Sequence, residues 1–271
     1  MRWILFNSEL MSAAEPCFLF NDLAIQRGYG VFDFFRLNQH KPLFIDEHLN
    51  RLFFSAAQMR LNIDLSKQQL KEHVEELISK NNFPNSGVRI TITGGYSEDN
   101  LSIGKPNVVI SQHSFTVPTL AQREKGMKLV TYDHQRQLPH VKTIDYTMSI
   151  WLKPWLEQSN ADDLLYHQNG AITESPRSNF FIVTNEDKIA TAGENILKGI
   201  TRSKVIQLAK EHFEVEERPI QLQELLSARE AFITSTTKEI LPVLQVDDHI
   251  FPERKVTAKL QQLFTEFVRA Q

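Results

Sequence analysis

The dipeptide Asn169–Gly170 constrains the fold of this chain more than any other short feature of its sequence. It stands between two short apolar runs in LLYHQNGAITES, and an Asn-Gly pair in that setting is the strongest local signal for a β-hairpin. The segment SNFFIVTNEDKIATA indicates a second hairpin, and AREAFITSTTKEILPV indicates a strand that runs into a polar turn. We therefore expect the second half of the chain to be rich in β-strands.

The first part of the chain mixes helical and strand patterns. Apolar residues at helical spacing predict a helix over 45–61, with Asp46 as its N-cap, and another over 66–82. Ser66 and Gln69 form a capping-box pattern at the start of the second of these helices. Strands are expected at 30–37, 88–95 and 107–115, and further helices at 201–212 and 257–270. Together with the hairpins, these segments predict an α+β fold.

The length of the chain favours two lobes over a single core. At 271 residues it lies at the upper end of the range for one domain, and two lobes account for it better. A polar stretch that begins near Pro118 separates the mixed first part from the strand-rich second part. We expect a small α/β lobe at 1–117, a linker at 118–127 and a larger β-rich lobe at 128–271.

Composition narrows the class of protein. The net charge of −3 argues against binding nucleic acid or an anionic membrane through bulk charge, and no apolar run approaches the length of a membrane span. The single cysteine, Cys17, excludes an intrachain disulfide, and the N-terminus turns polar too quickly for a signal peptide, so we expect a cytoplasmic protein. Nine histidines without metal-ligand spacing give no support to a metal site.

Four short segments carry the candidate chemistry. Lys142 stands among β-branched residues in LPHVKTIDY, and Glu174 follows the first hairpin. In LKGITRSK, Gly199 precedes a predicted helix, whose free N–H groups favour an anion. In TSTTKE, hydroxyls and turn amides follow a strand and offer a second anion site. Taken singly, the segments are better explained as a solvated lysine, an exposed carboxylate, a helix cap and a loop.

Taken together, the four segments supply an amine, a carboxylate and groups that bind phosphate. Pyridoxal 5′-phosphate requires this set, because it needs a lysine for its Schiff base, an acid that keeps its ring nitrogen protonated, and an anion site. The combination therefore predicts a cofactor-dependent enzyme.

The chain also resembles the class IV, or fold type IV, aminotransferases, which include branched-chain aminotransferases, D-amino-acid transaminases and aminodeoxychorismate lyase. The similar segments follow the family's order: DLAIQRGYGVFDFFR, HLNRLFFSA, VKTIDY, ITESPRSNFFIV, ILKGITR and FITSTTKEILPV. Lys198 departs from the family's Leu-Pro-Gly-Ile-Thr-Arg, and Ser235 stands where the family has a glycine. The resemblance implies a two-lobed fold type IV enzyme, at least a homodimer, that acts on an amino acid and a 2-oxo acid.

The resemblance also implies roles for individual residues. Lys142 forms the Schiff base and moves the substrate proton, Glu174 faces the ring nitrogen, and Arg51 contacts the phosphate. Tyr146 falls where several relatives have a tyrosine near the phenolic oxygen of the cofactor. The implied cofactor-binding residues are Arg51, Lys142, Tyr146, Glu174, Asn179, Gly199, Ile200, Thr201, Ser235 and Thr236.

Two arginines compete for the substrate carboxylate. The best-known D-amino-acid transaminases carry an arginine before a glycine at a strand end where this chain has Gly94–Gly95. Arg89 stands where branched-chain enzymes tend to have an arginine, and Arg27 stands where many relatives have an aromatic residue. Either guanidinium suits a carboxylate, and either can instead pair with a local acid. The implied substrate-binding residues are Arg27, Arg89, Thr236 and Thr237, and L-branched-chain and D-amino acids both stay open as donors.

Two other functions are weighed against the aminotransferase. Aminodeoxychorismate lyase belongs to the same family, but it typically follows its lysine with His-Leu-Asn-Arg, whereas this chain continues Thr-Ile-Asp-Tyr. A non-catalytic binding protein on the same scaffold would require decay of the cofactor residues, yet Lys142 and Glu174 are both present. The sequence therefore favours the aminotransferase.

Overall fold

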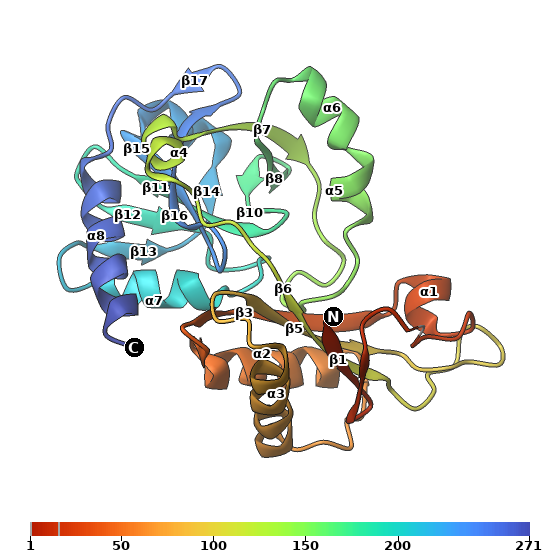
Figure 1. Cartoon of the computed structure of the whole chain (residues 1–271). Helices are drawn as coiled ribbons and strands as arrows, with labels where there is room; N and C mark the ends of the chain where they lie inside the picture. The colour runs from red at the N-terminus through yellow and green to blue at the C-terminus, as the bar shows by residue number, and fades with distance from the viewer. Residues whose placement is uncertain (1, 16) are drawn as a thin grey trace. The chain divides into compact units, whose positions relative to one another are not determined.

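The computed structural model describes residues 2–15 and 17–271, which form two compact units (Figure 1). The first unit extends to Phe115 and also includes Val141–Asp145, and the second comprises Thr116–His140 and Tyr146–Gln271. The short stretch 141–145 thus belongs to the first unit although both of its flanks belong to the second. Both helices and strands are present, which confirms the predicted α+β class.

The first unit is built on a six-stranded sheet with the order β2-β1-β6-β5-β3-β4, in which every neighbouring pair is antiparallel. Its elements are β1 (Trp3–Phe6), β2 (Glu9–Ser12), α1 (Leu23–Arg27), β3 (Gly30–Asn38), β4 (Lys41–Pro42), α2 (Ile45–Gln58), α3 (Lys67–Asn81), β5 (Gly87–Thr93) and β6 (Val108–His113).

The core of the first unit lies between this sheet and the helices α2 and α3 (Figure 1). Alternate residues of a strand point to one face of its sheet, so Val31 and Phe35 of β3 meet Leu52 of α2 and Val74 of α3 in one buried cluster. Val141 is fully buried in the same cluster. The stretch 141–145 therefore contributes to the core of this unit.

The two predicted helices of the first unit begin in different ways. At α3 the capping box is confirmed, because Ser66 Oγ accepts from the N–H of Gln69 and Gln69 Oε1 accepts from the N–H of Ser66. At α2 the predicted N-cap Asp46 is wrong. The cap position is held by Phe44 in the left-handed conformation with φ of 56°, and Asp46 lies in the first turn, where its charge suits the helix dipole.

The second unit contains an eleven-stranded sheet with the main order β13-β12-β11-β15-β16-β7-β8-β9-β14. β10 pairs with β11 and β17 pairs with β16 at its side. The elements of this unit are α4 (Leu120–Lys125), β7 (Met127–Asp133), α5 (Thr147–Trp151), α6 (Lys153–Gln158), β8 (Asp163–Gln168), β9 (Ala171–Ile172), β10 (Glu174–Ser175), β11 (Ser178–Val183), β12 (Ile189–Thr191), α7 (Ile200–Ala209), β13 (Val215–Glu217), β14 (Ile220–Gln221), the 3-10 helix η1 (Leu222–Ser227), β15 (Glu230–Ser235), β16 (Glu239–Val246), β17 (His249–Ile250) and α8 (Lys255–Arg269).

Both hairpins expected from the sequence are confirmed. β8 and β9 pair antiparallel across Asn169 and Gly170, which have φ values of 50° and 86°, the left-handed conformations that such a turn demands. β11 pairs antiparallel with β12, and β15 turns into β16 through the expected polar segment. Most of the segment 118–127, expected as a linker, is the short helix α4 with Thr119 at its N-cap.

A buried carboxylate holds the last helix, α8, in place. Glu230 on β15 is 1% exposed. Its Oε1 accepts from the N–H of Val256 at 2.8 Å, and its Oε2 accepts from the N–H and hydroxyl of Thr257 at 2.8 and 2.7 Å. Arg254 at the N-cap makes no side-chain capping bond. The first N–H groups of the helix are satisfied instead by Glu230, which lies far from them in the sequence. Across residues 2–15 and 17–271, no helix combines the length and apolarity needed to cross a membrane.

Candidate active site

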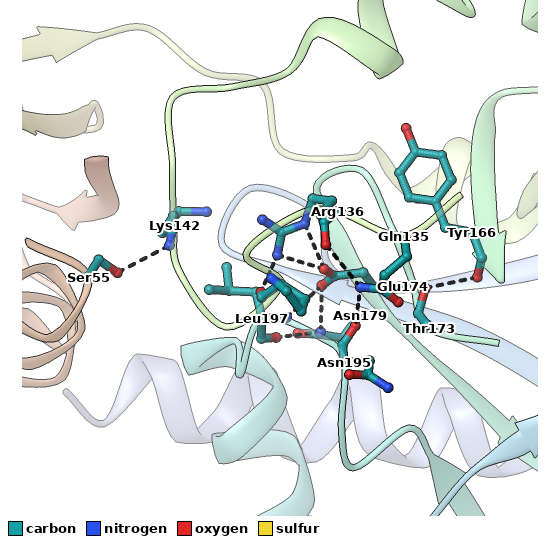
Figure 2. A network of polar contacts seen from close by, with 11 residues as sticks. Ser55, Gln135, Arg136, Lys142, Tyr166, Thr173, Glu174, Asn179, Asn195 and Leu197 are labelled. Atoms are coloured by element: carbon teal, nitrogen blue, oxygen red, sulfur yellow. Dashed lines mark hydrogen bonds and ion pairs between the residues drawn. The ribbon is translucent and has the colours of Figure 1, made fainter. Parts of the chain in front are cut away.

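The backbone of Lys142 is anchored on both sides within the first unit. Its N–H donates to the hydroxyl of Ser55 at 3.1 Å, and its carbonyl accepts from the N–H of Phe32 at 3.0 Å. Figure 2 shows the Ser55 hydroxyl directed at this backbone nitrogen. The Lys142 amine lies 4.7 Å from the centre of the Phe32 ring, a cation–π distance. Both the backbone of the lysine and the surroundings of its amine are thus defined by the small sheet and α2.

A buried triad on the same unit orients Arg51. The Asp33 side chain is 1% exposed and accepts from Arg51 Nε and Nη2, both at 2.8 Å. Its Oδ1 also lies 2.7 Å from His48 Nδ1. The two carboxylate oxygens therefore fix the plane of the guanidinium, and Nη1 of Arg51 is the group left to meet an anion.

The charges in this triad are set by burial and by one another. Burial acts to raise the pKa of Asp33, but the charges and hydrogen bonds of Arg51 and His48 outweigh it and hold that pKa well below its usual range. Burial lowers the pKa of His48, and the charges of Arg51 and Lys142 act in the same direction against the attraction of Asp33. When His48 is neutral, the 2.7 Å contact with the ionised Asp33 requires that its Nδ1 carry the proton and donate it.

The sequence of α2 explains why these side chains meet. His48, Arg51 and Ser55 follow one another at intervals of three and four residues, which places them on one face of the helix. His48 and Ser55 are buried and Arg51 is largely buried, so this face looks into the protein. One helix therefore carries the predicted phosphate ligand and the anchor of the lysine backbone.

In the second unit, Glu174 is held by three groups. Arg136 donates to its Oε1 from Nε at 3.0 Å and from Nη2 at 2.8 Å. Its Oε2 accepts from the backbone N–H of Leu197 at 3.0 Å and from the amide of Asn179 at 3.4 Å. Figure 2 shows these donors converging on the carboxylate. Glu174 is buried, with 5% of the residue exposed. An acid fixed in this way is suited to hold a protonated ring nitrogen.

Arg136 is a site residue that sequence reasoning missed. It follows β7 in the loop segment HQRQLPH, also donates to the carbonyl of Pro139, and forms an ion pair with Glu174. A single arginine in a polar loop carries no periodic or motif signal. Only its position six residues before Lys142 could have drawn attention to it.

The start of α7 is suited to an anion. Gly199 is the N-cap and has no side chain that could cap the first N–H groups of the helix, which belong to Ile200 and its successor Thr201. A Cβ atom built on Gly199 would lie 2.3 Å from Oδ1 of Asn179. A side chain at position 199 is therefore excluded by the amide that also contacts Glu174.

The other predicted residues of the second unit lie in three places. Ser235 ends β15 and Thr236 and Thr237 follow it in the turn to β16, where Ser235 Oγ accepts from the N–H of Lys238 at 3.1 Å and the other two are half-buried. Tyr146 occupies the N-cap position of α5 and is half-buried. Asn179, on β11, pairs in the sheet with Glu174 on one side and with Thr234, next to Ser235, on the other.

The two candidate arginines of the first unit differ in their surroundings. Arg27 is exposed at the end of α1 and donates to the carbonyl of Gln26 at 2.8 Å. Arg89 is half-buried, donates to Thr91 at 3.1 Å, and holds its guanidinium 3.8 Å from the centre of the Phe32 ring. The ring that Lys142 contacts is thus also contacted by Arg89, whereas Arg27 is not part of this group.

Each unit therefore carries one cluster. The first brings together Lys142, Arg51 and Arg89 around β3 and α2, and the second brings together Glu174, Asn179 and the start of α7. In the part of the chain that the structure describes, no group of three or more His, Cys, Asp or Glu side chains is arranged to hold a metal ion.

Comparison with known proteins decides the family, because residues 30–246 match the family described as amino-transferase class IV. The chain belongs to the class IV aminotransferases. This aminotransferase is 31% identical over 251 residues to a D-alanine aminotransferase of Bacillus licheniformis, with 90% of this chain and 88% of the relative covered. It is 32% identical over 259 residues to a protein of Methanocaldococcus jannaschii provisionally named a branched-chain-amino-acid aminotransferase, with coverage of 90% and 89%.

The fold of this aminotransferase also matches solved structures over almost the whole chain. The branched-chain amino acid aminotransferase of Escherichia coli superposes with a TM-score of 0.91 at 26% identity, with 98% of this chain and 94% of that chain covered. The fold type IV architecture expected from the sequence is confirmed. The class IV aminotransferases depend on pyridoxal 5′-phosphate.

The residues of this aminotransferase fit that cofactor. Lys142 is an amine on an anchored backbone, and Glu174 is a buried acid with a fixed orientation. At the start of α7, Gly199 has neither a side chain that could cap the helix nor room for one, so the first backbone N–H groups can serve a phosphate. An amine, an acid and an anion site are the three features that the cofactor needs.

Proposed function

We propose that this aminotransferase moves an amino group between an amino acid and a 2-oxo acid such as 2-oxoglutarate or pyruvate, with Lys142 and Glu174 as its central residues. The observation that carries the proposal is the fixed carboxylate of Glu174, whose oxygens accept from Arg136, Leu197 and Asn179. When bound, pyridoxal 5′-phosphate supplies an aldehyde that reacts with amines and a ring that accepts electrons. An acid kept in one orientation favours the protonated ring that such electron acceptance requires.

Lys142 has two tasks in this proposal. Its amine would hold the cofactor through the aldehyde, and its Nζ, when not bound to the cofactor, would serve as the base that takes the proton from the substrate α-carbon and later gives a proton back. The anchored backbone of Lys142 supports this role, because a base that moves a proton between two carbons must stay close to both.

The phosphate is proposed to bind Arg51, the start of α7 and the turn that includes Ser235 and Thr236. Arg51 offers Nη1 from a guanidinium whose other edge is fixed by Asp33. At α7, the backbone N–H groups and the helix dipole favour a dianion. Tyr146 is proposed to face the phenolic oxygen. These contacts bind the cofactor equally in all stages of the reaction, so they position it without lowering the barrier.

Arg89 is the better-supported ligand of the substrate carboxylate. Its guanidinium and the amine of Lys142 contact the same Phe32 ring, at 3.8 and 4.7 Å from the ring centre. Backbone amides near Thr236 and Thr237 are proposed to share the carboxylate. Replacing Arg89 with alanine should raise the KM for both the amino acid and the 2-oxo acid at least tenfold, while the Arg27→Ala variant should keep both KM values within twofold. Equal KM values in the two variants would contradict this assignment.

The amino donor is proposed to be either a D-amino acid or an L-branched-chain amino acid, the two specificities named among the relatives. The loss of cofactor absorbance in the presence of L-leucine and of D-alanine, followed in separate cuvettes, decides between them. Release of pyruvate from aminodeoxychorismate without any added 2-oxo acid would instead identify a lyase.

We also propose that the protein acts as a homodimer in the cytoplasm. Large apolar side chains are exposed on two segments of the first unit. An antiparallel β-bridge between Asp22 and Tyr96 joins these two segments. They are Leu19, Phe20, Ile25 and Leu101. Exposed apolar groups of this size are typical of a contact with another chain. Light scattering should give twice the mass of 31.3 kDa, and a monomer would contradict the proposal. The single cysteine, which forms no intrachain disulfide, supports the cytoplasm, and a tagged copy in cell fractions tests it.

Borohydride reduction tests the central role of Lys142. In the loaded protein it should fix the mass of the cofactor on the peptide that carries Lys142. The Lys142→Ala variant should carry no added mass, and the exposed control Lys153→Ala should behave as the unchanged protein does. Added mass on another lysine, or none in the unchanged protein, would refute the proposed function.

A further inference from the structure

The hydrogen bonds around Lys142 fix two peptide groups at once. Its N–H belongs to the peptide before its Cα and donates to Ser55, and its carbonyl belongs to the peptide after its Cα and accepts from Phe32. The partner at Phe32 is backbone and exists for any sequence. The partner at Ser55 is a side chain, and it is the one element of this clamp that the sequence has to supply.

Ser55 is unusual for a serine inside a helix, where it lies in the last turn of α2. Such hydroxyls commonly bond to the carbonyl of the preceding turn or point to solvent. Ser55 instead is 0% exposed, and its hydroxyl accepts from a backbone N–H 87 positions further along the chain. A serine side chain adds little apolar packing at a buried helical position. What Ser55 contributes is therefore the hydrogen bond that its hydroxyl accepts from Lys142.

We propose that Ser55 is a positioning residue for the reaction: its hydroxyl sets the backbone of Lys142 so that the lysine amine reaches both carbons between which it moves a proton. This inference rests on the proposed function of Lys142. Arg51, the proposed phosphate-binding residue, precedes Ser55 by one helical turn. The single helix α2 therefore positions both Arg51 and the backbone of Lys142.

The position of the Lys142 amine is sensitive to the backbone because the side chain is long. A lysine amine is connected to its Cα by four rotatable bonds, so a small rotation of the backbone moves the amine by a larger distance. Without Ser55 Oγ, the N–H of Lys142 lacks this acceptor and the preceding peptide is free to rotate towards another one. A misplacement of about 1 Å in a reacting group can lower a rate by about 100-fold, so the predicted cost falls on kcat.

A pair of variants of equal shape isolates the hydroxyl. Ser55→Thr and Ser55→Val add the same bulk to the helix, and only threonine keeps an oxygen that accepts. With the holoenzyme, Ser55→Val should have a kcat about 10- to 50-fold below that of Ser55→Thr, while the KM for the amino donor stays within about twofold. Equal kcat values in the two variants would overturn the proposal.

Ser86→Ala is the matched control for loss of a buried serine. Ser86 lies in the same unit, is also 0% exposed, donates to the carbonyl of Phe83 and accepts from Gln112. Its loss should lower the melting temperature and leave kcat unchanged. If Ser86→Ala lowers kcat as much as Ser55→Val, the effect of Ser55 is one of general stability and the proposal is refuted.

Hydrogen exchange provides a readout that needs no activity. The amide of Lys142 in the unchanged protein should exchange at least about 100-fold more slowly than an open amide, and in Ser55→Val it should exchange about tenfold faster than in Ser55→Thr. Fast exchange in the unchanged protein would refute the anchor even if neither variant folds. If the protection is present but borohydride fixes no cofactor at Lys142, the proposed function fails while the anchor stands.

Discussion

Replacing Glu230 with glutamine should destabilise the second unit markedly. The carboxylate is fully buried and accepts three hydrogen bonds from the first turn of α8. Glutamine keeps one acceptor oxygen. If that oxygen serves Thr257, the amide NH₂ faces the N–H of Val256, so one bond is lost and two donors oppose each other.

The size of the effect follows from these bonds. A hydrogen bond to a charged group contributes about 1.5–3 kcal/mol, and a buried donor without a partner costs about 1–3 kcal/mol. We take about 3 kcal/mol as the expected loss in the free energy of unfolding, since the remaining atoms can shift. For a unit of this size, that corresponds to a melting temperature about 6–12 °C lower.

Thermal and urea melts followed by circular dichroism measure this difference. Glu266→Gln is the matched control, because Glu266 lies on the same helix, is exposed, and its carboxylate accepts from the amide of Gln262 one turn earlier. It should change the free energy of unfolding by less than about 0.5 kcal/mol. If Glu230→Gln melts within about 2 °C of Glu266→Gln at an unchanged urea slope, the assignment of Glu230 as the cap of α8 is wrong.

Three further predictions concern the site. Gly199→Ala should weaken binding of pyridoxal 5′-phosphate at least tenfold in an absorbance titration, because the new Cβ would meet Asn179 at 2.3 Å; unchanged affinity would contradict the argument. Glu174→Gln should keep the cofactor bound and slow the half-reaction in stopped-flow absorbance by about 100-fold, and rates equal to those of the unchanged protein would refute the role of the acid. The lowered pKa of His48 means that, as the pH falls, the unfolded chain takes up a proton at this residue before the folded chain does. Stability should therefore fall from pH 7 to pH 5, by up to about 1.4 kcal/mol per pH unit, and His48→Asn should fall less steeply in urea melts at each pH.

Local sequence patterns predicted the elements whose structure is decided locally. The capping box at Ser66 and the Asn169–Gly170 hairpin were both found where expected, because each depends on hydrogen bonds within a few residues. Asp46 failed as a cap for the opposite reason. The chain enters α2 from a turn in which Phe44 takes a left-handed conformation, and that conformation is set by neighbours in the fold.

The residues of the site also fall into those that local sequence patterns predict and those that they do not. Lys142 and Glu174 carry motif signals, whereas their supports do not. Arg136 is one arginine in a polar loop, and Ser55 is one small residue on an amphipathic helix, so each gains meaning only from a partner distant in sequence. Asp33 did offer a signal, since a carboxylate inside the aromatic strand VFDFF needs a buried cation, but the sequence does not say which one.

The membership of residues 141–145 in the first unit has a consequence for biosynthesis. A nascent chain that ends at Phe115 holds every strand and helix of that unit, yet it lacks Val141 in the core and the partners of Ser55, Phe32 and Gly30. The small unit is therefore incomplete until the ribosome has added the first strand of its neighbour and the segment that follows. The segment that completes this unit is the one that carries Lys142.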